Sequence, residues 1–590
     1  MPGRGLSGIF IVIVLLSAWC VTGKQASAQG TLAEDTDSIR GMVVNSVTHE
    51  AIARALVFSP DNRFATMTDS QGRFEFTFPQ GETDRGNDAV PAGAAPSVSS
   101  RREFNRPDML IARKPGFLTD QGNESLNLPM SPATKEITIS LVPEALIVGH
   151  VALPTSEAPD RIQVEIYRRQ VQDGRAHWHS AGVATTKSTG EFRFPELSAG
   201  TYRLFTHELQ DRDPQIAVPG GQLYGYAPVY FPNATSFASG SAIQLLSGQT
   251  YQADLSLVRQ PYYPVKVAVA NVPPATGLAI TVFPDGRKGP GYALGYAAHE
   301  QSIEGSLPNG IYTLEASGYG QNPFNGSLNI TVHGAPLVGP VMTLAPGRAL
   351  SLNVKEEFTT TESTGATSWS DGARTFKLRG PRTYLNVTLV SADEFDQQRG
   401  ASLRPPSGPD DESLVIDNVQ PGRYWVQINS SRGFARSITS GGIDLLHEPL
   451  VVGSGGASPP IEVTMADDGG KIEGKVEGAD ASLSGTERPS TLGSGMASPV
   501  FYTPFAYIYC FPLPDGSGQF TEAVAYSDGK FTSPPMPPGV YLVLAFKRKQ
   551  SELEYRNPEA MRAYGAKGQT VRVAAGKTEH LQLGLISSSE

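Results

Sequence analysis

The fold of this chain is indicated most clearly by the stretch Ser188-Thr-Gly-Glu-Phe-Arg-Phe-Pro-Glu-Leu-Ser-Ala-Gly-Thr-Tyr-Arg-Leu204. Phe192 and Phe194 alternate with charged residues, which is the period-2 pattern of a half-buried β-strand. Gly190, just before them, can adopt the positive φ that a tight turn requires. The stretch therefore predicts a strand, a tight turn and a second strand that carries Tyr202 back into a hydrophobic core.

Weaker copies of this pattern recur at a nearly constant spacing. A glycine two residues before a tyrosine (Gly-x-Tyr) occurs at Tyr202, Tyr312, Tyr424 and Tyr541, which are 110, 112 and 117 residues apart. A period of this length is a domain length rather than the unit of a solenoid. Each of these tyrosines is expected to be buried with its hydroxyl close to a backbone partner, as in the tyrosine corner of other β-sandwiches.

The composition agrees with several domains built from short strands and many turns. The chain has 590 residues, with 62 glycines, 46 prolines and only 18% charged residues. We predict an all-β fold, a tandem array of about five Ig/transthyretin-like β-sandwich domains after a signal peptide. The predicted ranges are 1–28 for the signal peptide, then 38–143, 144–258, 259–346, 347–466 and 467–586 for the β-sandwiches.

The N-terminus has the features of a secretory signal peptide. Arg4 provides a short positive region, residues 9–16 are apolar, and Ala26-Ser-Ala28 is a small-x-small cleavage site. Cleavage after Ala28 is expected to release a chain exported to the periplasm, the outer surface or the extracellular space. The apolar run is too short to span a bilayer permanently, so no transmembrane anchor is expected in the mature chain.

The two cysteines do not predict a disulfide. Cys20 is expected to leave with the signal peptide, and one remaining thiol cannot form an internal bridge. Cys510 lies in a strand-like segment and is interpreted as a small buried hydrophobic residue. The domains are therefore expected to be held by packing alone.

Several turns and strands resemble bacterial carboxypeptidase regulatory-like domains. The predicted opening strands share a central glycine, as in Ile39-Arg-Gly-Met-Val43 and Lys471-Ile-Glu-Gly-Lys-Val476. An Asp-x-x-Gly-x-Phe turn begins at Asp69, and Lys114-Pro-Gly-Phe117 is similar to the lysine-x-glycine-tyrosine turn of that family. The resemblance implies exported transthyretin-like β-sandwiches. These are grouped with carbohydrate-binding-like folds and generally serve as accessories to an enzyme or a receptor.

The sequence lacks the motifs of the zinc enzymes that the family name suggests. None of the nine histidines has a glutamate at the third following position, and His-Glu-x-x-His and Gly-x-Ser-x-Gly are absent. His177 and His179 share one face of a predicted strand, but polar surface is favoured over a metal site there. We predict no enzyme activity, no catalytic residues, no metal and no cofactor. The net charge of −10 gives no electrostatic footprint for nucleic acid.

A dense aromatic cluster occurs in a segment rich in glycine and proline. Tyr230 and Phe231 are expected to pack against the sandwich, whereas Tyr224 and Tyr226 are open to two interpretations, a packed edge or exposed rings that stack on sugars. The sequence thus predicts an exported, non-catalytic β-sandwich scaffold at the bacterial cell envelope, with a glycan or a cell-envelope protein as partner. The alternative is an accessory subunit of an envelope enzyme or of an outer-membrane uptake receptor.

Overall fold

The computed structural model describes residues 37–586 of the chain with gaps. The gaps are residues 79–108, 119–127, 130–135, 155–157, 211–220, 275, 285, 319–323, 360–366, 372–373, 379–384, 396–399, 408–410, 431, 454, 456–457, 479–503, 514–517 and 527. The predicted signal peptide lies outside the described residues. Strands dominate, and α1 (Pro558–Arg562) is the single helix in the described part of the chain, which confirms the all-β fold class.

The chain forms five β-sandwiches, and each of the first three has two packed sheets. Sandwich one contains β1 (Asp37–Asn45), β2 (Leu56–Phe58), β3 (Ala65–Met67), β4 (Arg73–Phe78), β5 (Met109–Arg113), β6 (Leu128–Pro129) and β7 (Glu136–Leu141). Sandwich two contains β8 (Ala145–Ala152), β9 (Gln163–Gln172), β10 (Arg175–Thr185), β11 (Glu191–Leu197), β12 (Gly200–Thr206), β15 (Ile243–Leu245), β16 (Thr250–Gln252) and β17 (Leu255–Ser256). Sandwich three contains β13 (Leu209–Gln210), β14 (Leu223–Tyr226), β18 (Arg259–Ala270), β19 (Leu278–Pro284), β20 (Gly295–Ala297), β21 (Ser302–Pro308), β22 (Gly310–Gly318), β23 (Phe324–Val332), β24 (Leu337–Thr343) and β25 (Ala345–Pro346).

The last two sandwiches continue in the same way. Sandwich four contains β26 (Arg348–Glu357), β29 (Leu385–Ser391), β30 (Gly400–Ser402), β31 (Val415–Val419), β32 (Gly422–Ser430), β33 (Phe434–Ser440), β34 (Ile443–Asp444), β35 (Leu450–Val452) and β36 (Ile461–Ala466), with a separate hairpin of β27 (Thr367–Asp371) and β28 (Arg374–Leu378). Sandwich five contains β37 (Lys471–Val476), β38 (Ala506–Pro512), β39 (Thr521–Ala525), β40 (Lys530–Thr532), β41 (Gly539–Phe546), β42 (Gln569–Val573), β43 (Thr578–Leu583) and β44 (Leu585–Ile586).

All five sandwiches share one arrangement around the opening strand. The opening strands β1, β8, β18, β26 and β37 each have an antiparallel neighbour and a parallel neighbour. The parallel neighbour is a closing strand of the same sandwich, namely β7, β16, β24, β36 and β43. Each unit therefore has such a sheet and its own hydrophobic core. Sandwiches two and three interleave in sequence, because β13 and β14 precede β15 in the chain but pair into the sheet of β18. The domain boundaries given above remain predictions.

The glycine of the opening strand and the phenylalanine of the Gly-x-Phe strand form one packing unit. They lie directly opposite each other in three sandwiches, as Gly41 and Phe74, Gly149 and Phe192, and Gly474 and Phe531. A methyl group on any of these glycines would overlap with the opposite phenyl ring and with a carbonyl oxygen of the closing segment. Glycine is therefore required where the ring crosses the strand.

The prediction for the Gly-x-Tyr tyrosines is confirmed in all four copies. Each ring is buried, and each hydroxyl donates to the carbonyl oxygen four residues earlier. The oxygen–oxygen distances are 2.8 Å for Tyr202, 3.1 Å for Tyr312, 2.9 Å for Tyr424 and 2.6 Å for Tyr541. The bond closes the turn before the strand, so burial of the ring and geometry of the turn are coupled.

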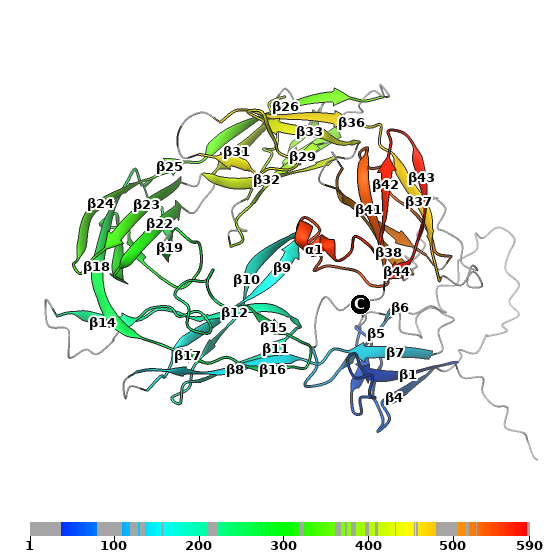
Figure 1. Cartoon of the computed structure of the whole chain (residues 1–590), viewed down its shortest axis with the longest axis horizontal. Helices are drawn as coiled ribbons and strands as arrows, with labels where there is room; N and C mark the ends of the chain where they lie inside the picture. Colours follow the sequence, from blue (N-terminus) through cyan, green and yellow to red (C-terminus); the bar gives the residue numbers. More distant parts are fainter. Residues whose placement is uncertain are drawn as a thin grey trace, which may run out of the picture.

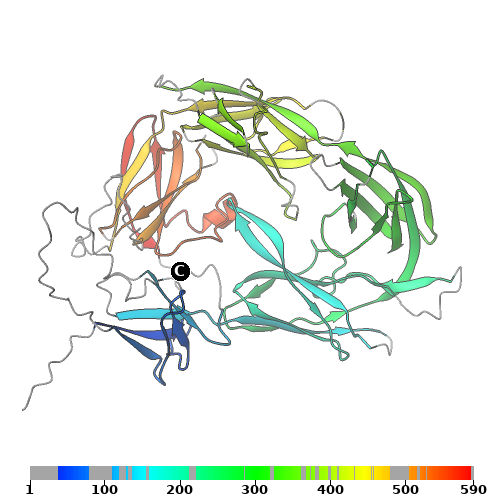
Figure 2. The same ribbon diagram turned by 180° about the vertical axis from the view of Figure 1, so that it is seen from behind.

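The five sandwiches are arranged along a curved path, and one hairpin crosses its interior (Figure 1). The hairpin of β9 and β10 projects from sandwich two toward α1 of sandwich five, and the view from behind shows the same approach (Figure 2). Along this path, sandwiches three and four lie between sandwiches two and five. This hairpin, named the clamp hairpin below, brings together segments that are distant in the sequence.

Candidate functional site

The clamp hairpin ends in a two-residue turn, Asp173-Gly174. Gln172 pairs with Arg175, and φ is +48° at Asp173 and +70° at Gly174. Positive φ at both positions is the geometry of a type I′ turn, for which Asp-Gly is a favoured sequence. A Cβ atom at residue 174 would lie 2.7 Å from the ring of Tyr555, so glycine also permits the close approach of sandwich five.

The carboxylate of Asp173 accepts hydrogen bonds from three sandwiches. The hydroxyl of Tyr555 donates to Oδ1 at 2.5 Å, and Nη2 of Arg556 lies 3.1 Å from Oδ2. Nε2 of Gln427 in sandwich four donates to Oδ2 at 3.1 Å, and Nη1 of Arg175 in the hairpin itself does so at 3.3 Å. One side chain therefore ties sandwiches two, four and five together.

Two ion pairs support the hairpin behind its tip. Both guanidinium Nη atoms of Arg169 bond the carboxylate of Glu554, one at 2.9 Å, and Nη2 of Arg168 lies 3.3 Å from Glu552. Burial alone would raise the pKa of Glu554, but the hydrogen bonds from Arg169 and Asn557 hold that pKa below its usual value. Asn557 also accepts a hydrogen bond from the Glu559 amide and so caps α1, which positions this segment beside the hairpin.

Sandwich four contacts the hairpin through aromatic rings. The guanidinium carbon of Arg175 lies 3.6 Å from the ring centroid of Trp425, which is a close cation–π contact. The backbone amide of Trp178 donates to the carbonyl of Glu394 at 2.9 Å. Next to it, Phe395 packs edge-on against Phe237 of sandwich two, with ring centroids 4.6 Å apart. The hairpin contact with sandwich four is therefore partly apolar.

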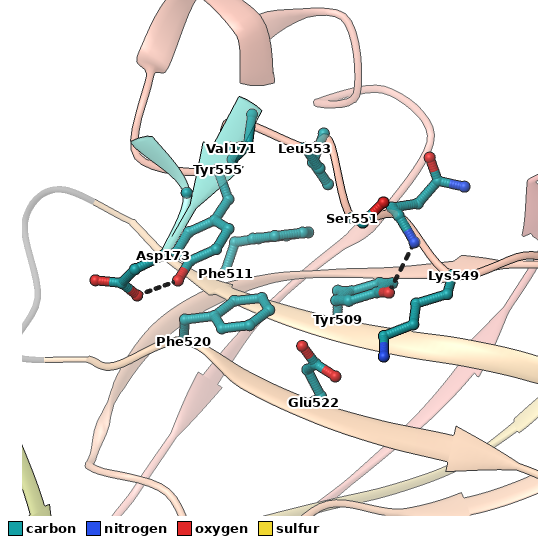
Figure 3. A pocket seen from close by; sticks show the side chains of 12 residues that line it. Val171, Asp173, Tyr509, Phe511, Phe520, Glu522, Lys549, Ser551, Leu553 and Tyr555 are labelled. Atoms are coloured by element: carbon teal, nitrogen blue, oxygen red, sulfur yellow. Dashed lines mark hydrogen bonds between the residues drawn. The ribbon is translucent and has the colours of Figure 1, made fainter. Parts of the chain in front are cut away.

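Two cavities flank the tip of the hairpin. The aromatic cavity, about 320 Å³ in volume, lies between the hairpin and sandwich five (Figure 3). Its wall includes Phe520 and Tyr555, which are stacked with centroids 4.0 Å apart, and Tyr509, whose hydroxyl accepts from the amide of Gln550 at 3.0 Å. The second, the junction cavity, has a volume of about 410 Å³ and is lined by residues of sandwiches two, four and five.

The two tyrosines proposed as a sugar platform are placed differently by the structure. They lie on the strand β14, which pairs with β18 of sandwich three, and not in a loop. Tyr226 is only 2% exposed and belongs to the core of sandwich two, so of the two interpretations the packed one holds for this residue and the stacking one does not. Tyr224 is 38% exposed, with the guanidinium of Arg259 over its ring at 4.5 Å. Only Tyr224 is therefore left to test as a stacking ring.

The other aromatic residues of that cluster pack as expected. Tyr230 is buried beside Phe205, and Phe231 packs against the core of sandwich two. Cys510 is likewise fully buried, and burial raises the pKa of its thiol to about 12. These three side chains contribute to the packing of the sandwiches.

The arrangement that most resembles a catalytic group is a chain of three polar residues in sandwich two. The Ser180 hydroxyl donates to Oε1 of Glu165 at 2.5 Å, and Nε2 of His207 lies 2.7 Å from Oε2 of the same carboxylate. The carboxylate thus separates the hydroxyl from the imidazole, so His207 is not placed to activate Ser180 as a nucleophile. The contacts serve instead to pair the buried Glu165 carboxylate.

The described residues contain no cluster of three or more His, Cys, Asp or Glu side chains that would suit a metal ion. Burial lowers the pKa of His177, the first residue of the histidine pair noted in the sequence.

Among the described residues, no helix combines the length and apolar character needed to cross a bilayer.

Comparison with known proteins finds similarity of fold class only. No protein-family model matches the chain, and no curated protein matches it in sequence. Among solved structures, the minor pilin GBS52 of Streptococcus agalactiae is 11% identical over 37% of this chain and 94% of the pilin, with a TM-score of 0.17. The major pilin subunit BcpA of Bacillus cereus is 12% identical over 55% of this chain and 99% of its own, with a TM-score of 0.13.

The Bacillus anthracis TIE protein is 9% identical over 75% of this chain and 74% of its own length, also with a TM-score of 0.13. Scores this low do not place the sandwiches in the same mutual positions, so no function is transferred from these proteins. The resemblance to carboxypeptidase regulatory-like domains rests on the sequence features alone.

Proposed function

We propose that this chain is an exported, non-catalytic scaffold of the bacterial cell envelope that holds its β-sandwich surfaces in fixed positions for a binding partner. The observation that carries this proposal is the clamp hairpin, whose Asp173 is bonded to sandwiches four and five. Domains joined only by short connections move relative to one another by default. The contact between Asp173 and Tyr555, 382 residues apart in sequence, restricts that motion. Fixed spacing between surfaces is what a scaffold provides.

The polar chemistry of the described residues supports a non-catalytic role. The chain of Ser180, Glu165 and His207 has its carboxylate in the middle, and the sequence contains no His-Glu-x-x-His motif. The polar cluster around Asp173 is used for contacts between sandwiches. A partner would therefore supply any chemistry in the assembly.

A crosslinking experiment in intact cells tests the scaffold proposal. The tagged full chain is expected to be crosslinked to envelope material, and Asp173→Ala, which releases the clamp, is expected to lose that product. Asp160→Ala is the matched control, because Asp160 is exposed in the same sandwich and, among the described residues, forms an ion pair only with its neighbour Arg161. Equal crosslinking by the Asp173→Ala variant, or turnover of a peptide or glycan by the purified chain, would contradict the proposal.

The nature of the partner separates the scaffold from the accessory role. An envelope enzyme or an outer-membrane uptake receptor recovered as the crosslinked product would favour an accessory subunit. Recovery of polysaccharide alone would favour a structural scaffold. In both cases the sandwiches would have to hold a fixed arrangement for the partner to bind.

A second candidate function is glycan binding at Tyr224, favoured by the exposed ring on β14. Stacking on a pyranose needs one free aromatic face. Retention of the full chain on insoluble polysaccharides is expected to fall in Tyr224→Ala and to be unchanged in Tyr526→Ala, since Tyr526 is equally exposed but lies in sandwich five. Equal retention of the two variants would remove Tyr224 as a binding residue.

A further inference from the structure

The junction cavity has walls that suit a small, polar and anionic ligand. It is bounded by the clamp hairpin, sandwich four and sandwich five, and its volume of about 410 Å³ lies within the range of small-molecule sites. Such sites occur preferentially where domains meet. The polar side chains that line it and carry the argument are Gln172, Arg175, Gln427, Asn429, Gln519 and Arg556.

The charged residues of this cavity leave an excess of positive charge. Two guanidinium groups, of Arg175 and Arg556, line it together with one carboxylate, that of Asp173. Both guanidinium groups bond that single carboxylate, so one unit of positive charge is not neutralised within the wall. Burial, together with the positive charge of Arg556, lowers the pKa of Arg175 to about 10, which still leaves it charged at neutral pH. A second carboxylate, brought by a ligand, would complete the pairing.

The amide side chains supply hydrogen bonds in both directions. Nε2 of Gln427 and Nε2 of Gln519 donate to protein atoms, which leaves their carbonyl oxygens as acceptors. Gln172 and Asn429 are exposed, and neither side chain bonds another residue in the described part of the chain. Planar amides present one acceptor and two donors, which matches the alternating donor and acceptor capacity of neighbouring hydroxyl groups.

We propose that the junction cavity binds a sugar acid, a uronate unit of an acidic saccharide. Its carboxylate faces Arg175 and Arg556, and its hydroxyls bond the amides of Gln172 and Asn429. This site is separate from Tyr224, and its occupation does not require the envelope partner of the scaffold proposal. The ligand also bridges the three sandwiches that Asp173 already joins.

Calorimetric titration of the full exported chain with trigalacturonate tests this inference. The same saccharide with its carboxylates methyl-esterified keeps the ring hydroxyls and lacks the charge. We expect the acid to bind and the ester to bind about tenfold more weakly, because hydrogen bonds to charged groups are the stronger ones. We also expect binding of the acid to weaken as salt is raised. No heat of binding with the acid, or equal affinity for acid and ester, would overturn the proposal.

Variants locate the binding to the junction cavity. The double variant Gln172→Ala, Asn429→Ala is expected to weaken binding about tenfold without loosening the clamp, since neither side chain takes part in it. Gln71→Ala is the control, an exposed glutamine of sandwich one. Arg175→Gln is expected to abolish the preference for acid over ester, with Arg193→Gln of β11 as its control. Unchanged affinity in the double variant, or equally tight binding of a short peptide through its terminal carboxylate, would show that the cavity is not a sugar-acid site.

Discussion

Tyr202 shows how a single residue fixes a turn and a core at the same time. Its ring is buried in sandwich two, and its hydroxyl donates to the Ser198 carbonyl at 2.8 Å. The first residue of its strand, Gly200, adopts a φ of +156°, so the chain enters the strand from an unusual turn. Loss of the ring would open the core, whereas loss of the hydroxyl alone would leave one carbonyl without its partner.

Tyr202→Ala is therefore expected to lower the free energy of unfolding by about 3–5 kcal/mol, as for other large buried aromatic residues. Tyr202→Phe is expected to lower it by about 1 kcal/mol through the lost hydrogen bond. Denaturant unfolding of the full chain measures both, with Tyr526→Ala as an exposed control. A loss below about 1 kcal/mol for Tyr202→Ala would contradict the role of this ring in the core.

Gly149 is the second residue on which sandwich two depends. Gly149→Ala is expected to destabilise the chain by about 1–3 kcal/mol or more, because the added methyl overlaps with the Phe192 ring and the Ala253 carbonyl. In a Phe192→Leu background the same change is expected to cost less, since the ring is gone and the carbonyl remains. A double-mutant cycle measures this coupling. Additive effects of the two changes would show that glycine and ring do not share the same space.

Glu208 is expected to make stability depend on pH. Its side chain lies between sandwiches two and three, where Oε2 accepts from the Ala293 amide at 3.3 Å, with the Tyr262 side chain nearby. Burial is the main cause that raises the pKa of Glu208 from 4.5 to about 7. The folded chain thus holds this proton more tightly than the unfolded chain does. The resulting stability is full below pH 4.5 and is lost as pH rises through about 7.

The comparison of wild type with Glu208→Gln isolates this effect from other titrating groups. The urea midpoint of wild type is expected to fall between pH 5 and pH 8 by more than the midpoint of Glu208→Gln. Identical pH dependence of the two proteins would mean that the Glu208 carboxyl is solvated in the folded state.

Among the elements, those with local signals were predictable and those with distant partners were not. The Gly-x-Tyr strands were predictable because their tyrosines bond a carbonyl only four residues away. The cap and start of α1, at Asn557 and Pro558, are similarly local. β14 was not predicted as a strand, because its pairing strand, β18, belongs to the next sandwich.

The clamp hairpin is the element of the candidate site that the sequence did not reveal. Asp173-Gly174 is a favoured sequence for a hairpin turn, but it does not show what the tip of the hairpin contacts. Its partners were not predictable, because Tyr555 and Arg556 are more than 380 residues away and no local pattern relates them to Asp173. Neither the turn Asp173-Gly174 nor the segment Tyr555-Arg556 carries a recognisable site motif. They form the site because the curved arrangement of the sandwiches brings them together.

For the whole molecule, the clamp joins sandwich two directly to sandwiches four and five. The connections along the chain from sandwich two to five pass through sandwiches three and four, which offers many places for bending. Arg169, Asp173 and Tyr555 close this path by a direct contact. Sandwiches two and five are therefore expected to keep a fixed spacing.

Pulsed electron paramagnetic resonance between two spin labels tests this claim most directly. The labels are placed at Glu191→Cys in sandwich two and Thr532→Cys in sandwich five, both exposed positions, while the native Cys510 is buried and unreactive. We expect one narrow distance distribution that becomes broad in the Arg169→Ala, Asp173→Ala variant. A distribution that is already broad with the clamp residues intact, or that stays narrow without them, would contradict it.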